Sequence, residues 1–130
     1  KEMTIDLNKR YTKSELLELE PLDLLDLLTA RMKVHIPDQI TSENQVQAAT
    51  ELSKAMQYET YLSEIADRAD LYKRKFKIAG DKDNSNLMQM RENVLKGHAS
   101  RMKRSYDAIS RLFTIKNQEL QEMKLLGLTS

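Results

Sequence analysis

The chain has 130 residues, a length typical of a single domain, and 32% of them are charged while 5% are aromatic. Three Gly and two Pro are too few for the many turns of an all-β fold, whereas long helices need few turns. The sequence has no Cys, which excludes disulfides and thiol chemistry, and no apolar run reaches the roughly 20 residues of a membrane span. We therefore expect an all-α protein with a cytoplasmic location and no membrane contact.

The net charge of +1 conceals an uneven distribution along the chain. Residues 1–66 contain 7 Lys and Arg against 12 Asp and Glu, whereas residues 67–130 contain 14 against 8. Such an asymmetry is typical of a chain with a polyanion-binding half, or of two halves that attract each other.

Residues 1–40 are predicted to form an N-terminal arm followed by short, acidic, leucine-rich helices. Thr12 and Glu15 have the spacing of a capping box, which predicts a helix over residues 13–19. Pro21 lacks an N–H and therefore suits the first turn of a second helix.

The second helix is predicted over residues 21–34. Four of its apolar side chains have the spacing of one buried face, which two further leucines widen. The four are Leu22, Leu25, Leu28 and Met32, and the two are Leu24 and Leu27.

Residues 41–130 are predicted to form a long helical hairpin. Thr41 or Ser42 is a suitable N-cap, and no Gly or Pro follows before Gly80, which predicts a helix over residues 43–79. Its apolar residues recur every three or four positions and predict one buried stripe. The stripe consists of Val46, Ala49, Leu52, Ala55, Met56, Leu62, Ile65, Ala69, Tyr72 and Phe76.

The strongest turn signal in the chain is the segment 80–84, after which Asn84 or Ser85 is expected to cap a helix over residues 85–126. A turn this short forces the two long helices to run antiparallel. The apolar stripe predicted for the last helix consists of Leu95, Ala99, Met102, Tyr106, Ile109 and Phe113.

The two stripes approximate a heptad with Leu62 and Leu95 at position a, which predicts a coiled-coil-like antiparallel hairpin. A hairpin buries only one stripe on each helix, so other apolar residues need cover, and we expect the protein to self-associate. The uncovered residues are expected to be Tyr58, Tyr61, Leu71, Ile78, Met88, Met90, Leu120, Met123, Leu125 and Leu126.

Residues 81–92 resemble an EF-hand calcium loop. Asp81, Asp83 and Ser85 occupy the first, third and fifth ligand positions, and Glu92 occupies the twelfth. Asn86 stands where an EF-hand loop has glycine, and no second loop accompanies this one. The alternative is an ordinary polar turn followed by a helix N-cap, for which no metal ligand is needed.

Residues 68–104 contain 11 Lys and Arg against 4 Asp and Glu, so the turn end of the hairpin is predicted to be basic. Such a surface could follow the phosphates of a nucleic acid, although solvated basic faces that pair with Glu and Asp are also common on coiled coils. The candidate polyanion-binding residues are Lys73, Arg74, Lys75, Lys96, Arg101, Lys103, Arg104 and Arg111.

Catalysis finds little support in the sequence. The two histidines, His35 and His98, have no acidic residue at metal-ligand spacing, and His98 lies near the apolar stripe, where a packing role is expected. No glycine-rich phosphate loop is present. We expect a non-enzymatic helical interaction protein, without a cofactor, that self-associates and binds a protein or other macromolecular partner. The alternative is a nucleic-acid-binding accessory protein that uses the basic face.

Overall fold

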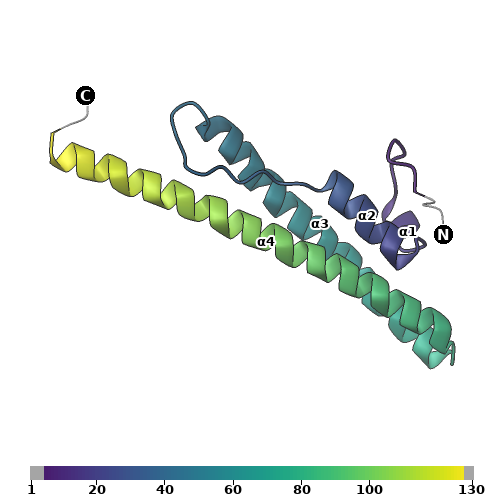
Figure 1. Cartoon of the computed structure of the whole chain (residues 1–130). Helices are drawn as coiled ribbons and strands as arrows, with labels where there is room; N and C mark the ends of the chain where they lie inside the picture. The colour runs from purple at the N-terminus through teal and green to yellow at the C-terminus, as the bar shows by residue number, and fades with distance from the viewer. Residues whose placement is uncertain (1–4, 128–130) are drawn as a thin grey trace.

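The computed structural model describes residues 5–127, which form four helices and no strand (Figure 1). Residues 1–4 of the predicted arm and residues 128–130 of the predicted hairpin segment lie outside this range. The helices are α1 (Lys13–Leu16), α2 (Pro21–Arg31), α3 (Gln45–Ile78) and α4 (Lys82–Leu125). The long helices α3 and α4 form the antiparallel hairpin, and α1 and α2 lie against its turn-proximal half. The all-α class and the helical hairpin are therefore confirmed.

Local sequence signals explain where α1 and α2 begin. The hydroxyl of Thr12 accepts a hydrogen bond from the Glu15 N–H at 3.1 Å, and Glu15 Oε1 accepts one from the Thr12 N–H at 3.0 Å. This capping box confirms the predicted start of α1. Pro21 occupies the first turn of α2, as predicted.

Both N-terminal helices end earlier than predicted, α1 at Leu16 and α2 at Arg31. The backbone of Met32 leaves the helical region, with φ −103° and ψ 78°. Its carbonyl oxygen lies 3.0 Å from Nε2 of His98 on α4. The end of α2 therefore coincides with a contact to α4, which the sequence near Met32 could not predict.

The connection between α3 and α4 is shorter than the predicted turn over residues 80–84. Gly80 has φ +78°, a left-handed conformation that glycine adopts without steric cost, and the Asp81 N–H then bonds the carbonyl of Phe76 at 2.9 Å. Asp81 caps α4, because its Oδ1 accepts from the Asn84 N–H at 3.2 Å. The helix therefore starts at Lys82, and the expectation that Asn84 or Ser85 caps it is wrong.

At its other end, α3 begins at Gln45, two residues later than predicted. Just before it, Thr41 Oγ1 accepts from the Asn44 N–H at 3.2 Å, and Asn44 Oδ1 accepts from the Thr41 N–H at 2.8 Å. This reciprocal pair closes the turn that leads into α3.

One apolar core joins the N-terminal helices to the hairpin. Leu24 of α2, Leu62 and Ile65 of α3 and Leu95 of α4 are fully enclosed. Alanines on α3 and α4 allow the two helix backbones to approach closely. The other buried members of this cluster are Leu16, Leu17, Leu27, Leu28, Ala66, Ala69, Met88, Ala99 and Met102.

The predicted buried face of α2 is wrong at two positions. Leu22 is 73% exposed and Leu25 is also exposed, whereas Leu24 and Leu27 are buried beside Leu28. Leucine occurs at so many positions that two helical faces are nearly equally apolar. Only the packing against α4 selects one of them.

The predicted stripe of α3 is correct in the middle of the helix, where Ala55, Leu62, Ile65 and Ala69 are buried. It is wrong at Val46, which is 76% exposed, and at Ala49, Met56 and Tyr72, which are also exposed. In the first half of the helix the buried positions are Ala48, Glu51 and Ala55. These three continue the heptad of Leu62 backwards, so burial follows the heptad register and not the polarity of each side chain.

The predicted stripe of α4 agrees better with the structure, since Leu95, Ala99, Met102 and Ile109 are buried, while Tyr106 and Phe113 are half-buried. Met88, which was expected to need cover, lies in the core. Within residues 5–127, no helix combines the length and the apolar character that crossing a bilayer requires.

Replacing Leu62 by Ala is expected to lower the free energy of unfolding by about 2–5 kcal/mol, because it leaves a cavity in the core between the helices. Urea denaturation followed by circular dichroism measures this loss. Leu71→Ala serves as the control: Leu71 lies on the same helix, is 61% exposed, and should change stability by less than about 0.5 kcal/mol. Equal effects of the two variants would contradict the assigned core.

Candidate interaction surfaces

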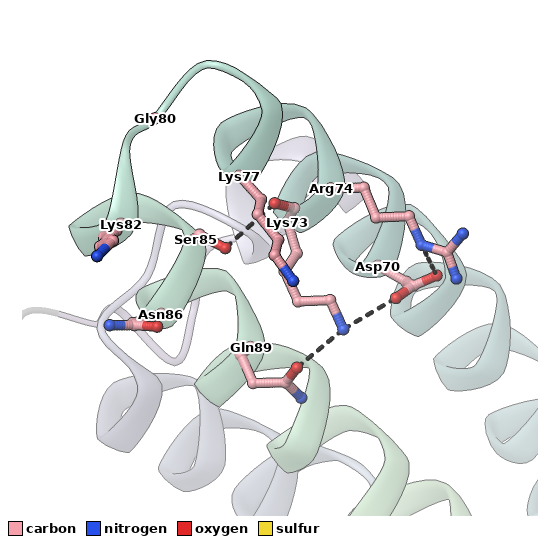
Figure 2. A pocket seen from close by; sticks show the side chains of 9 residues that line it. All are labelled: Asp70, Lys73, Arg74, Lys77, Gly80, Lys82, Ser85, Asn86 and Gln89. Atoms are coloured by element: carbon pink, nitrogen blue, oxygen red, sulfur yellow. Dashed lines mark hydrogen bonds and ion pairs between the residues drawn. The ribbon is translucent and has the colours of Figure 1, made fainter.

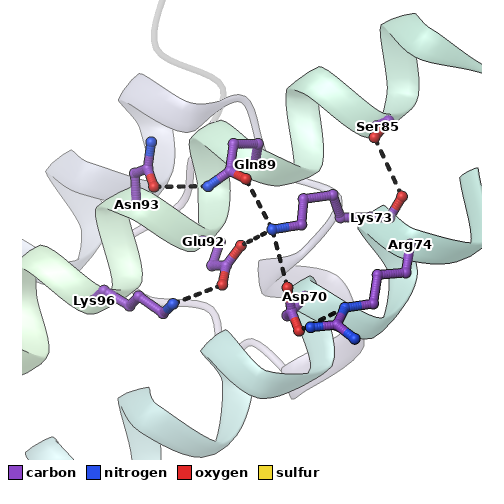
Figure 3. A network of polar contacts seen from close by, with 8 residues as sticks. All are labelled: Asp70, Lys73, Arg74, Ser85, Gln89, Glu92, Asn93 and Lys96. Atoms are coloured by element: carbon purple, nitrogen blue, oxygen red, sulfur yellow. Dashed lines mark hydrogen bonds and ion pairs between the residues drawn. The ribbon is translucent and has the colours of Figure 1, made fainter. Parts of the chain in front are cut away.

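A network of charged side chains crosses the hairpin near its turn (Figure 3). The Glu92 side chain is only 3% exposed, and its carboxylate lies 2.8 Å from the ammonium groups of both Lys73 and Lys96. Lys73 on α3 also reaches Asp70 at 2.9 Å and Gln89 at 2.8 Å. The network therefore joins α3 to α4 through a carboxylate that the helix pair buries.

Electrostatics keep this network ionised. Burial by itself raises the pKa of Glu92, but the hydrogen bonds from Lys73 and Lys96 outweigh it and hold the pKa below its usual value. The same contacts raise the pKa of Lys73 and Lys96. Because the pKa of Glu92 is lowered on folding, its contribution to stability is present above about pH 4.5 and is lost as the pH falls through the folded-state pKa.

The eight candidate polyanion-binding residues do not come together at one site. Lys73 and Lys96 bind Glu92, Arg74 Nε lies 3.1 Å from Asp70 Oδ2, and the Lys75 ammonium lies 5.9 Å from the ring centroid of Tyr72. The other four are exposed and form no ion pair with any residue in the range 5–127. These four are Arg101, Lys103, Arg104 and Arg111 on α4, and they are called the basic face below.

The helix ends at the turn also carry cations that the sequence analysis did not select. Lys77 in the last turn of α3 and Lys82 in the first turn of α4 line a groove of about 760 Å³ beside Lys73 and Arg74 (Figure 2). The sequence could have identified both lysines from their positions on either side of Gly80, because a tight turn brings the residues that flank it close together.

The resemblance of residues 81–92 to a calcium loop is not supported by the structure. Residues 82–92 form the start of α4, and a rise of about 1.5 Å per residue separates Asp81 from Glu92 by roughly 16 Å. The carboxylate of Glu92 instead binds the ammonium groups of Lys73 and Lys96. Among residues 5–127, no group of three or more His, Asp or Glu side chains is placed to hold a metal ion.

His98 and Arg91 anchor the N-terminal helices to α4. Nε2 of His98 lies 3.0 Å from the carbonyl oxygen of Met32, and Arg91 Nε donates to the carbonyl of Leu19 at 2.7 Å. The imidazole is 3% exposed, and its Nδ1 is buried without a hydrogen-bond partner. The expected packing role of His98 is confirmed by this burial. Burial lowers its pKa, which favours the neutral ring with the proton on Nε2.

Apolar side chains remain exposed at the end of the hairpin opposite the turn. Helix α4 has 44 residues and α3 has 34, so α4 continues past the start of α3 (Figure 1). A shallow groove of about 540 Å³ is lined there by Phe113 of α4 and by Val46 and Ala49 of α3. Leu120 and Met123 are exposed further along the free part of α4. We call these five side chains the open-end surface.

A comparison of the chain with models of protein families, with curated proteins and with solved structures gives no match.

Stability is expected to fall as the pH decreases below about 6.5, the ordinary pKa of histidine. The folded state keeps His98 neutral, so the unfolded chain binds more protons in this range and gains stability from them. His98→Gln can still donate to the Met32 carbonyl and should reduce the loss between pH 7.5 and pH 5.5, measured as the urea midpoint at each pH. An unchanged pH dependence in His98→Gln would refute the assignment.

Proposed function

We propose that the protein is a non-enzymatic helical interaction protein that associates with a second copy of itself and binds a macromolecular partner. The observation that carries this proposal is the open-end surface, where four exposed apolar side chains from two helices surround the half-buried Phe113. Exposed apolar groups gathered at one end of a molecule are typical of an interaction site.

The proposed occupant of the open-end surface is the same surface of a second copy. Ile109 is the last buried residue of the α4 stripe, and Phe113, Leu120 and Met123 continue it at helical spacing toward the free end of α4. A second helix with a matching apolar stripe would cover this end of α4. The α4 helix of a second copy can do so when the two α4 ends lie antiparallel around a two-fold axis.

Charge does not oppose such a pairing. The free part of α4 carries Lys116 and Lys124 together with Glu119 and Glu122, so two copies bring equal numbers of cations and carboxylates to the interface. A stable dimer would need about 1,200 Å² or more of buried surface, which requires more than the last two turns of α4. We therefore expect the Val46 and Ala49 side of α3 to take part.

The protein is expected to be a dimer or larger at micromolar concentration, and Leu120→Glu/Met123→Glu should shift it toward monomer. Each introduced carboxylate would be buried without a partner in the interface. Multi-angle light scattering measures the mass of the two proteins. Ile78→Glu is the matched control, because Ile78 is 88% exposed at the opposite end of the hairpin and should leave the mass unchanged. A monomeric parent at high micromolar concentration would disprove self-association.

The second candidate function is nucleic-acid binding through the basic face. Arg101, Lys103, Arg104 and Arg111 are exposed, and no carboxylate among residues 5–127 pairs with them, so they are free to contact phosphates. Contacts of this kind position a protein on the backbone without reading sequence. Lys73, Lys96 and Arg74 support this candidate less, because each already binds a carboxylate of its own chain.

If the basic face binds nucleic acid, log affinity should fall linearly with log salt, with a slope near −0.9 per phosphate contact on duplex and about −0.7 on single strands. Lys103→Ala/Arg104→Ala should reduce the slope by about two contacts and weaken all sequences alike. Fluorescence anisotropy with labelled oligonucleotides at several salt concentrations provides the slopes. The fold should be unaffected, since both side chains are exposed. Identical slopes for the parent and the variant would mean that the basic face does not contact phosphates.

We propose the cytoplasm as the compartment because a chain without cysteine gains nothing from an oxidising one. A protein partner is proposed for the same exposed apolar surfaces that suggest self-association. The absence of catalysis is proposed because His98 binds a backbone carbonyl inside the core and His35 lies apart from any nucleophile pattern.

A further inference from the structure

The groove at the turn end of the hairpin lies between the last turns of α3 and the first turns of α4 (Figure 2). Its volume is about 760 Å³, against about 540 Å³ for the groove lined by Phe113 and Val46 at the open end. Four cationic side chains line it, three from α3 and one from α4, together with one carboxylate and several amide or hydroxyl groups. The cations are Lys73, Arg74, Lys77 and Lys82, and the carboxylate is Asp70.

The carboxylate in the groove is already neutralised. Asp70 Oδ1 lies 2.9 Å from the Lys73 ammonium, and Asp70 Oδ2 lies 3.1 Å from Nε of Arg74. Lys73 is also hydrogen-bonded to Gln89 and Glu92, both at 2.8 Å, so its three donors have acceptors. The charges of Asp70 and Lys73 are therefore balanced within the protein, and this part of the groove does not provide free positive charge.

The free donors are those nearest the turn. The side chains of Lys77, Lys82 and Asn86 form no hydrogen bond or ion pair with another residue of the described range, and the Arg74 side chain uses only its Nε. Ammonium and guanidinium groups can donate but cannot accept, so a partner for them must offer acceptor oxygens, and their positive charge favours an anion over a neutral acceptor. The N-terminus of α4 and the C-terminus of α3 meet at the same place with opposite dipoles, so the positive potential there comes from the side chains.

The surroundings favour phosphate over other anions. No aromatic side chain lines the groove, so it provides no surface on which a base could stack. A phosphate group carries up to two negative charges and three acceptor oxygens, which suits several donors that converge from different side chains. A carboxylate has one charge and two oxygens, so it would leave donors unpaired. Because the free cations come from both helices, a ligand with two or more phosphates in a row would reach all of them.

We infer that the turn-end groove is a binding site for an oligophosphate, held mainly by Lys77, Lys82 and the guanidinium of Arg74. The phosphates can belong to a free polyphosphate, to a nucleoside triphosphate or to the backbone of a nucleic acid. The site does not depend on self-association, and it uses lysines that lie outside the basic face considered above.

The test is a calorimetric titration of the full chain at low salt with inorganic tripolyphosphate. We expect saturable binding by the parent, and Lys77→Ala/Lys82→Ala should weaken it about tenfold or more, since charge-assisted hydrogen bonds are lost. Lys77→Arg/Lys82→Arg keeps the charges and should retain most of the affinity. Both lysines are exposed, so circular dichroism and the Tm of each variant should match those of the parent.

The control is Lys33→Ala/Arg68→Ala, which removes the same charge from exposed positions outside both the groove and the basic face. It should leave tripolyphosphate binding unchanged. If the control weakens tripolyphosphate binding as much as Lys77→Ala/Lys82→Ala does, the binding is general electrostatic attraction and the proposed site is wrong. Absence of tripolyphosphate binding by the parent would overturn it as well.

Two further ligands identify the source of the phosphates. ATP binding that matches tripolyphosphate, lost in Lys77→Ala/Lys82→Ala, supports the site and points to a nucleotide. Tighter binding of a mixed-sequence single-stranded oligonucleotide, lost in the same variant, supports the site and points to a nucleic-acid backbone. Hexaglutamate binding as tightly as tripolyphosphate would refute phosphate recognition and assign the groove to an acidic protein segment.

Discussion

The heptad register of α3 against α4 is the constraint on which the rest of the structure depends. The turn at Gly80 sets that register, and it places Leu62 and Ile65 in one core with Leu95 and Met102. Once the helices are aligned, the a and d positions along the middle of the pair are buried whatever their chemistry. Glu51 and His98 are buried for this reason, while the more apolar Val46 and Ile78 remain in solvent.

Each buried polar group then needs a partner, and these partners organise the surface. Glu92 binds the ammonium groups of Lys73 and Lys96, so part of the positive charge in the second half of the chain stabilises the contact between α3 and α4. His98 takes the Met32 carbonyl, which holds the chain just after α2 against α4. Arg91 does the same for the carbonyl of Leu19 after α1. The N-terminal helices are thus attached by polar contacts as well as by leucines.

The two ends of the hairpin differ in chemistry. The turn end has cationic side chains around a groove, because both helices contribute lysines next to the turn. The open end has exposed apolar side chains, because α4 is longer than α3 and its stripe continues without a partner. If two copies join at their open ends, the two turn-end grooves lie at opposite ends of the assembly and stay accessible. Self-association and anion binding would then not compete for the same surface.

The sequence by itself determined the helical class, the hairpin, the capping box of Thr12 and Glu15, and the turn at Gly80, because each rests on short-range steric or hydrogen-bonding rules. It also identified the basic turn end, since charge can be counted along the chain. It could not decide which leucine face of α2 is buried, because two faces were nearly equal. Nor could it divide the basic residues into those that bind Glu92 and those that are free. Those outcomes depend on which side chains meet across α2, α3 and α4, and only the tertiary structure brings such distant residues together.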